Sequence, residues 1–293
     1  MQQLIYVPPG ASLQSKNRIV ELAAKEPFIL SSVNGLGGEE ANIISSDIVG
    51  SDGEFYHGRK TGPIEIGCEL SVYGKTRAEM YAERMRLIGL LSLADDEHPG
   101  TLYYTNDYIS VKIGAVPKKA GDFRTRKRNY NIGEVTFYCP VPRWISLEEQ
   151  SVDVSSALSG FEFPCEFDGG VAFAKTSGII EITNNGTANT PVRITVVGPS
   201  TEPSVKNLTT GKKIKLSRNL ESNETLVIET ERGNKSVTLI DRSNDTTADA
   251  FGYLDPLSEF WELVPGNNRI LYGSDGTVET GLYISYFERY AGV

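Results

Sequence analysis

The amino-acid sequence predicts a mainly β protein, on three observations. The chain has 293 residues, about twice the roughly 150 residues of a typical domain, so two domains are expected and one large β-domain is the alternative. Short alternating runs of Val, Ile and Thr are separated by turns rich in Asn, Asp and Gly. One segment alone departs from this pattern, so we expect one helix among many strands.

The first half of the chain holds several strand-like runs bounded by turn residues. Apolar runs of this length and spacing fit strands that are buried on one or both faces. The strands expected there cover residues 26–33, 64–72, 101–104, 109–116 and 134–138.

The expected helix begins near Thr76. Thr76 and Glu79, three residues later, form a capping-box arrangement, and no Pro occurs from there to residue 93. Residues 95–100 then end the helix and turn the chain into the next strand. Residues at helical spacing form an apolar face that we expect to lie on a sheet: Ala78, Tyr81, Met85 and Ile88.

Residues 117–128 are locally basic and almost free of aliphatic side chains, which is typical of a projecting loop or hairpin tip. A solvated loop, a nucleic-acid patch and an arm that docks on an acidic neighbour are the three interpretations. In a chain of net charge −9, a basic projection is complementary to another copy of the same chain. The candidate inter-subunit arm consists of Lys118, Lys119, Arg124, Arg126, Lys127 and Arg128.

The second half follows an irregular polar stretch, and its residue pattern predicts antiparallel strands throughout. Its expected strands cover residues 178–182, 192–197, 214–216, 225–230, 237–240, 268–272 and 281–286. Strands at this spacing, separated by Gly-containing turns, suggest a sandwich or jelly roll. We therefore expect a first domain at 1–142, a linker at 143–160 and a second domain at 161–293.

The charge balance disfavours a nucleic-acid-binding protein. The chain has 29 basic and 38 acidic residues, and an acidic protein repels phosphate backbones. The sequence contains neither the signals of an export leader nor an apolar run of about 18 residues, so we expect neither export by the usual signal nor a membrane span. The three cysteines, Cys68, Cys139 and Cys165, form no disulfide framework and are expected to be buried thiols in a reducing compartment.

No residue pattern indicates an enzyme or a cofactor site. The two histidines, His57 and His98, each lie beside a glycine-containing turn and are expected on surface loops. Residues 35–38 (GLGG) lack the third glycine of a dinucleotide fingerprint, so we expect them to supply positive φ for a turn. We predict no catalytic, cofactor-binding or metal-ligating residues.

Two groups of acidic residues offer alternatives to the absence of a metal or catalytic site. Side-chain oxygens that could bind a hard cation such as calcium occur in one cluster, Asp241, Asn244, Asp245 and Asp249. The spacing of these residues fits no EF-hand loop, and such clusters are typical of turns. Glu259 and Glu262 flank Phe260 and Trp261, so one of them could be a glycosidase carboxylate beside an aromatic platform that binds sugar. The alternation of apolar and charged residues here fits better a strand with an aromatic residue in the core.

The order of several turn phrases resembles the distal tail proteins of long-tailed phages that infect Gram-positive bacteria. In the first half these phrases are PFILSSVNGLG at 27–37, GSDGEF at 50–55, the helix with Arg86 and Leu87, PGTL at 99–102 and VTFYCPVP at 135–142. In the second half they are ITNNGTA at 182–188, PVRI at 191–194, NLTTG at 207–211, LVIET at 226–230 and FWELVPGNN at 260–268. This chain has Glu229 where the family more often has Asp.

The resemblance implies an N-terminal β-sandwich with one helix and an extended hairpin or arm, followed by a C-terminal β-sandwich similar to galectins and carbohydrate-binding modules. It implies a structural protein of the virion, not an enzyme, made in the host cytoplasm and without cofactors or a membrane. Its expected partners are further copies of itself in a homohexameric ring, the major tail tube protein and the tail-associated hub or lysin protein. Receptor-binding proteins are further expected partners, and genomic DNA only passes through the channel.

The alternative function is a carbohydrate-binding accessory module of the tail that contacts the bacterial cell wall. It is based on the sandwich pattern and on aromatic residues of the second half, Phe251, Tyr253, Trp261 and Tyr272. Fold alone does not establish sugar binding.

Overall fold

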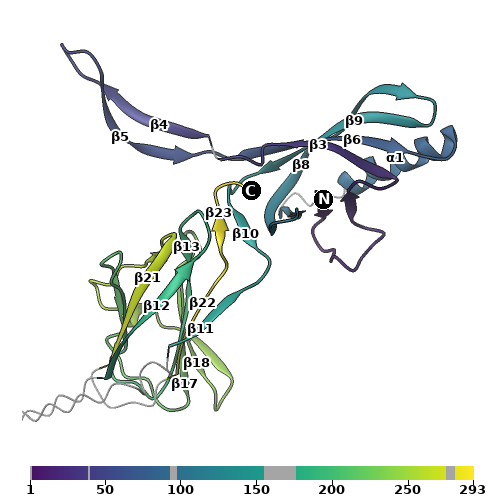
Figure 1. Cartoon of the computed structure of the whole chain (residues 1–293). Coiled ribbons are helices and arrows are strands. Elements are labelled where there is room, and N and C mark those ends of the chain that lie inside the picture. Colours follow the sequence, from purple (N-terminus) through teal and green to yellow (C-terminus); the bar gives the residue numbers. More distant parts are fainter. Residues whose placement is uncertain (1, 39, 93–97, 155–175, 275–280) are drawn as a thin grey trace, which may run out of the picture. The chain divides into compact units, whose positions relative to one another are not determined.

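The computed structural model describes residues 2–38, 40–92, 98–154, 176–274 and 281–293, without the side chains of 125–127 and 176–178. These residues form two compact units (Figure 1). Unit 1 comprises residues 1–147 and 290–293, and unit 2 comprises residues 148–289. The expectation of a mainly β chain with one α-helix is confirmed within the described residues.

Unit 1 is a β-sandwich built around one bent strand. Its elements are β1 (Gln3–Val7), β2 (Val20–Leu22), β3 (Phe28–Asn34), β4 (Ala41–Asp47), β5 (Glu54–Thr61), β6 (Ile64–Tyr73), α1 (Arg77–Leu91), β7 (Gly100–Thr105), β8 (Ser110–Lys127), β9 (Tyr130–Cys139) and β10 (Trp144–Ser146). The main sheet has the order β2-β1-β7-β8-β9-β6-β3. Residues 110–115 of β8 pair with β7, and β8 pairs with β9 from Val116 to Lys127. Strand β8 therefore carries the chain from one layer to the other.

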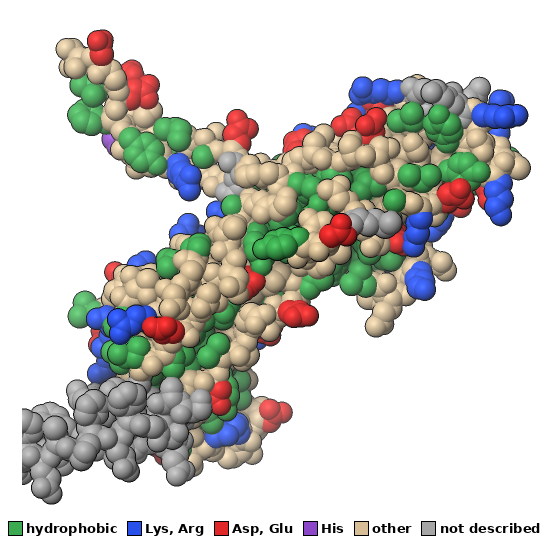
Figure 2. Space-filling model, viewed as in Figure 1, with side chains coloured by type: hydrophobic (Ala, Val, Ile, Leu, Met, Phe, Trp, Pro, Cys, Tyr) green, Lys and Arg blue, Asp and Glu red, His purple; other side chains and the backbone are tan. Residues whose placement is uncertain are grey.

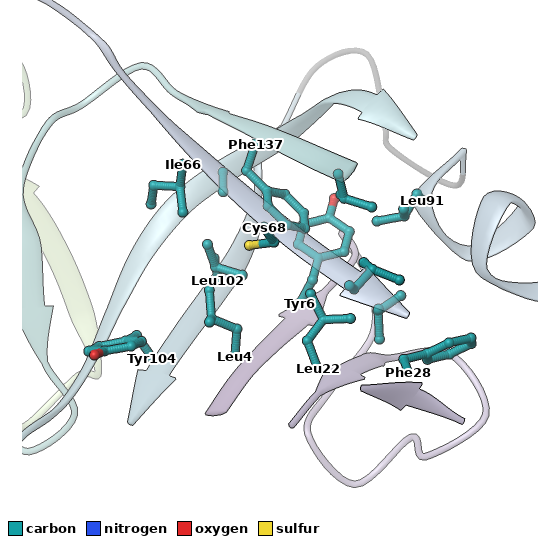
Figure 3. Close-up of a cluster of buried hydrophobic side chains, with 14 of the residues drawn as sticks. Leu4, Tyr6, Leu22, Phe28, Ile66, Cys68, Leu91, Leu102, Tyr104 and Phe137 are labelled. Atoms are coloured by element: carbon teal, nitrogen blue, oxygen red, sulfur yellow. The ribbon is translucent and has the colours of Figure 1, made fainter. Parts of the chain in front are cut away.

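The core of unit 1 lies between these two layers. Tyr6 from β1 packs against Phe137 from β9, with ring centroids 5.1 Å apart. Leu4 from β1, Leu102 from β7 and Cys68 from β6 belong to the same buried cluster (Figure 3). Alternate residues of each strand supply this core because successive side chains of a strand point to opposite faces.

Helix α1 begins where the capping box predicts. The Thr76 side chain accepts a hydrogen bond from the Glu79 backbone N–H at 3.2 Å, and the Glu79 carboxylate accepts one from the Lys75 N–H at 2.8 Å. These bonds satisfy N–H groups that a helix start leaves without partners.

The predicted buried face of α1 is wrong. The residues that pack into unit 1 are Met80, Leu87, Leu90 and Leu91. The expected core residues Met85 and Ile88 are instead 71% and 36% exposed, and Ala78 is also exposed. The helix has two apolar faces, and the sheet takes the face with three leucines. Periodicity identifies such faces but does not rank them.

Unit 2 is a second sandwich. Its elements are β11 (Gln150–Asp153), β12 (Thr176–Asn184), β13 (Thr190–Pro191), β14 (Arg193–Val197), β15 (Ser204–Asn207), β16 (Lys213–Lys215), β17 (Glu224–Glu229), β18 (Ser236–Asp241), β19 (Thr246–Asp249), the 3₁₀-helix η1 (Phe251–Tyr253), β20 (Glu262–Leu263), β21 (Gly266–Ser274) and β22 (Gly281–Tyr286). The last strand of the chain, β23 (Arg289–Tyr290), pairs with β10 in the sheet of unit 1. The sheets β11-β22-β14-β17-β18-β19 and β12-β21-β15-β16 share one core, in which Ile194 and Ile284 of the first join Ile270 of the second.

The last residues of the chain return to unit 1. The Val293 backbone N–H donates to the Leu36 carbonyl at 2.9 Å. The domain bounds expected from the sequence remain a prediction, and residues 155–160 of the expected linker lie outside the described residues. None of the helices described is long and apolar enough to cross a membrane.

Candidate assembly surfaces

Among the residues that the structure describes, no group of three or more His, Cys, Asp or Glu side chains is placed to hold a metal ion. His98 is exposed near a turn, as expected. The prediction for His57 is wrong in one respect, since His57 lies on strand β5 and not on a loop. It is exposed, and its Nε2 atom lies 2.7 Å from the Ser46 hydroxyl of the paired strand β4.

The acidic cluster near residue 241 lies at the hairpin of β18 and β19, with Asn244 and Asp245 in the turn and Asp241 and Asp249 on the two strands. The Asp241 carboxylate accepts hydrogen bonds from the Ser243 N–H and from the side-chain amides of Asn223 and Asn244, each at 2.8 Å. The bond from Ser243, followed by those from the two amides, lowers the pKa of Asp241 below its usual value. These donors hold the carboxylate in the turn geometry that the sequence favoured.

Two other expectations concern buried residues. Trp261 is 1% exposed, so it lies in the core as predicted and not on a surface platform. The strand predicted for this region is shorter than expected, because β20 covers only Glu262–Leu263. Cys68 and Cys139 are buried free thiols, as expected, and burial raises the pKa of both to about 12. Cys165 lies outside the described residues.

The candidate arm forms the distal part of the β8–β9 hairpin, and half of its basic residues already have partners within unit 1. Lys118 pairs with Glu65, while Lys119 and Arg124 pair with Asp122 at 2.9 and 2.8 Å. The Lys119 and Arg124 hydrogen bonds hold the pKa of Asp122 below its ordinary value. Arg128 is exposed at the turn, and the side chains of Arg126 and Lys127 lie outside the description. Docking of this arm on another copy stays a prediction.

The residue patterns did not locate the β4–β5 hairpin, although the family resemblance implied an extended hairpin or arm in this half of the chain. Nearly all described residues of the two strands are exposed. Strands β4 and β5 pair only with each other and project from the main sheet (Figure 1). Large apolar side chains on them face solvent, with exposed fractions from 52% to 64%: Ile43, Ile44, Phe55 and Tyr56. Figure 2 shows hydrophobic atoms along the projection. The signal in the sequence was two short apolar runs that flank the turn with Gly50 and Gly53.

The tip of this hairpin is acidic. Asp47 and Glu54 are directly opposite each other in the last described pair of the ladder, and Asp52 lies in the turn between them. No ion pair with a described Lys or Arg holds any of the three. Like charges placed opposite each other on a sheet destabilise it, so this tip is suited to a cationic partner.

Unit 2 carries an exposed aromatic group beside strand β18. Phe251 and Tyr253 are each 46% exposed, and Phe251 stacks on Phe260 with centroids 5.8 Å apart. The other two aromatic residues behind the carbohydrate-binding alternative do not lie on the surface. Trp261 and Tyr272 are 1% and 0% exposed, because both fill the core between the two sheets.

Two family models match the chain, one after the other. The model described as the phage tail protein RIFT-related domain matches residues 19–139. The model described as the siphovirus-type tail component, C-terminal domain, matches residues 185–290.

Solved structures extend this similarity over nearly the whole chain. The Dit protein of SPP1, described as a paradigm of the hub adsorption apparatus in phages that infect Gram-positive bacteria, is 16% identical, with a TM-score of 0.67 over 99% of each chain. A chain of the phage p2 baseplate in its activated conformation is 12% identical, with a TM-score of 0.45 over 97% of this chain and 98% of that one. No curated protein matches the chain at a significant level. The similarity to the SPP1 protein establishes a shared fold.

Proposed function

The chain belongs to the siphovirus-type Dit tail component family, and from this membership we propose that it assembles as a homohexameric ring at the distal end of a phage tail. It is a distal tail or baseplate hub component and therefore part of the virion. We further propose that it has no enzymatic activity and acts by holding other tail proteins together.

The β4–β5 hairpin is the observation that carries this proposal. A two-stranded hairpin alone is marginal in water, and both outer edges of this one are open. Its exposed Ile44, Phe55 and Tyr56 side chains add an apolar surface that a monomer would leave in contact with water. An element of this kind gains stability when another subunit covers it.

A ring covers such elements without forming fibres. A head-to-tail contact that closes after six copies gives each hairpin a partner and leaves no free end. In the proposed ring, one face contacts the major tail tube protein and the other the tail-associated hub or lysin protein. Unit 2 offers sites for receptor-binding or baseplate components, and genomic DNA passes through the channel.

The proposal is tested by co-purifying the chain with the tube protein and the hub protein from the same virus. We expect both to bind the assembled chain and to bind far less to a variant with Ile44→Asp and Phe55→Asp, whose rings do not form. The matched control is Leu13→Asp with Tyr108→Asp, two exposed apolar residues away from the hairpin. Equal binding by the hairpin variant and the parent chain would contradict the proposal.

The exposed aromatic group on unit 2 supports the second candidate function, contact with cell-wall carbohydrate. The side chains of Phe251 and Tyr253 offer apolar surface of the kind that packs on sugar rings, although the Arg218 guanidinium lies over the Tyr253 ring, 5.1 Å from its centroid. Incubation of the full chain with purified cell walls would detect binding that Phe251→Ala and Tyr253→Ala remove. Retention on walls that does not differ between these variants and the parent chain would eliminate this candidate.

A further inference from the structure

We propose that the β4–β5 hairpin of one copy docks on the exposed apolar face of helix α1 in the next copy, with its acidic tip against the basic residues at the start of that helix. The inference rests on the proposed ring and identifies which surface of the neighbour receives the hairpin. Apolar fit, charge and position within unit 1 each support it.

The receiving surface is the helix face that the sheet leaves uncovered. Met85 and Ile88 are 71% and 36% exposed, and Tyr81 is half-buried on the same face. Small residues, Ala78 and Ala82, lie exposed beside them and make the face shallow. Exposed apolar patches of this kind mark interaction sites, and the hairpin offers Ile44 and Phe55 to cover this one.

Basic residues adjoin this face at the helix start. The Gly74 backbone N–H donates to the Asn129 carbonyl at 3.1 Å, so the turn between β8 and β9 lies beside the residues that precede α1. Lys75, Arg77 and Arg128 are all exposed there. A single end of unit 1 thus combines an apolar helix face with three cationic side chains, and it includes one residue of the candidate arm.

The hairpin and this end lie too far apart to meet within one copy. Strand β6 starts three residues after β5 and ends four residues before α1, and its 10 residues span roughly 33 Å. Figure 1 shows the hairpin and α1 at opposite ends of unit 1. Figure 2 shows acidic atoms at the hairpin tip and basic atoms at the other end. A surface and its complement at opposite ends of one unit produce a head-to-tail contact.

Charge reversal tests the contact in both directions. One variant carries Asp47→Lys and Glu54→Lys on the hairpin, and the other carries Lys75→Glu and Arg77→Glu at the helix start. Acidic residues are favourable in the first turn of a helix, so the second variant is expected to fold. Each variant alone places like charges in every contact, and we expect the concentration for half-assembly to rise at least about tenfold.

An equimolar mixture of the two variants restores opposite charges in every contact of an alternating ring. We therefore expect the mixture to assemble to within about threefold of the parent chain, as measured by light scattering. The matched control, Lys16→Glu with Arg18→Glu, makes the same charge change on another exposed segment and should assemble like the parent. Circular dichroism and denaturant midpoints establish that each variant is folded.

Cross-linking gives an independent measure of the same contact. In a Cys165→Ser background, protein with Phe55→Cys is mixed with protein carrying Met85→Cys, and we expect linked dimers only in the mixture. Tyr108→Cys replaces Met85→Cys in the control, because Tyr108 is 95% exposed but lies on the turn between β7 and β8.

The outcomes separate this inference from the proposed function. Rings of the parent chain, combined with a mixture that fails to assemble or with equal linking to position 108, would overturn the docking site and leave the ring standing. A parent chain that never assembles, even with tube and hub proteins present, would overturn both.

Discussion

At the scale of single residues, Gly35 sets the course of the chain after β3. Its φ is +81°, and a Cβ atom there would lie 2.1 Å from the Glu65 carbonyl oxygen. We expect Gly35→Ala to lower the free energy of unfolding by at least about 2 kcal/mol, because both the backbone conformation and the close approach exclude a side chain. Denaturant unfolding measures the change. Gly37→Ala is the control, since a Cβ there meets nothing within 4 Å, and an equal loss in both variants would contradict this explanation.

The buried thiols allow a second residue-scale prediction. Burial raises the pKa of Cys68 and Cys139 to about 12, and the thiolate is the reactive form. In the Cys165→Ser background we expect almost no labelling by a thiol reagent at about pH 8 while the chain is folded. Both thiols should react once denaturant unfolds it. Rapid labelling of the folded protein would show that the core of unit 1 opens readily.

At the scale of elements, helix α1 separates a stabilising face from an exposed one. Leu87 is fully buried and Met85 is largely exposed, although both are apolar and two residues apart. We expect Leu87→Ala to cost about 2–5 kcal/mol of stability. Met85→Ala should change it by less than about 0.5 kcal/mol in protein kept below the assembly concentration. Comparable losses at the two positions would contradict the helix orientation described here.

The same helix shows what the sequence can and cannot reveal. The Thr76 cap depends on residues three apart and was predicted correctly, as were the strands near 64–72 and 134–138, whose side chains alternate toward a core. The buried helix face was predicted wrongly, because which apolar face meets the sheet depends on tertiary packing. Residue patterns did not locate the extended hairpin at β4–β5, because it builds no core and its apolar residues lack the regular alternation of a half-buried strand.

The candidate surfaces follow the same logic. Basic residues at 118–128 stood out by composition, but Lys118, Lys119 and Arg124 proved to be paired with carboxylates of their own unit. The Lys118–Glu65 pair joins β8 and β6, which lie on either side of β9, and Lys119 and Arg124 pair with Asp122 of their own strand. Sequence composition specifies neither arrangement. Sequence similarity to a tail family, by contrast, depends on ordered phrases along the whole chain and was confirmed.

At the scale of the whole molecule, the proposed function depends on assembly. The chain exposes an apolar hairpin with an acidic tip and an apolar helix face with basic neighbours, and the proposed ring covers both. Because part of the contact is electrostatic, we expect assembly to weaken as salt rises toward about 1 M, where the Debye length falls to about 3 Å. Light scattering across a salt series measures this, and assembly that strengthens steadily with salt would indicate a purely apolar contact.

The most direct test is the solution mass of the full chain across a concentration range, followed by electron microscopy of the largest species. We expect a particle of about six times the 32.1 kDa chain, with six-fold rings in projection. A monomer at every concentration, both alone and with the tube and hub proteins present, would contradict it.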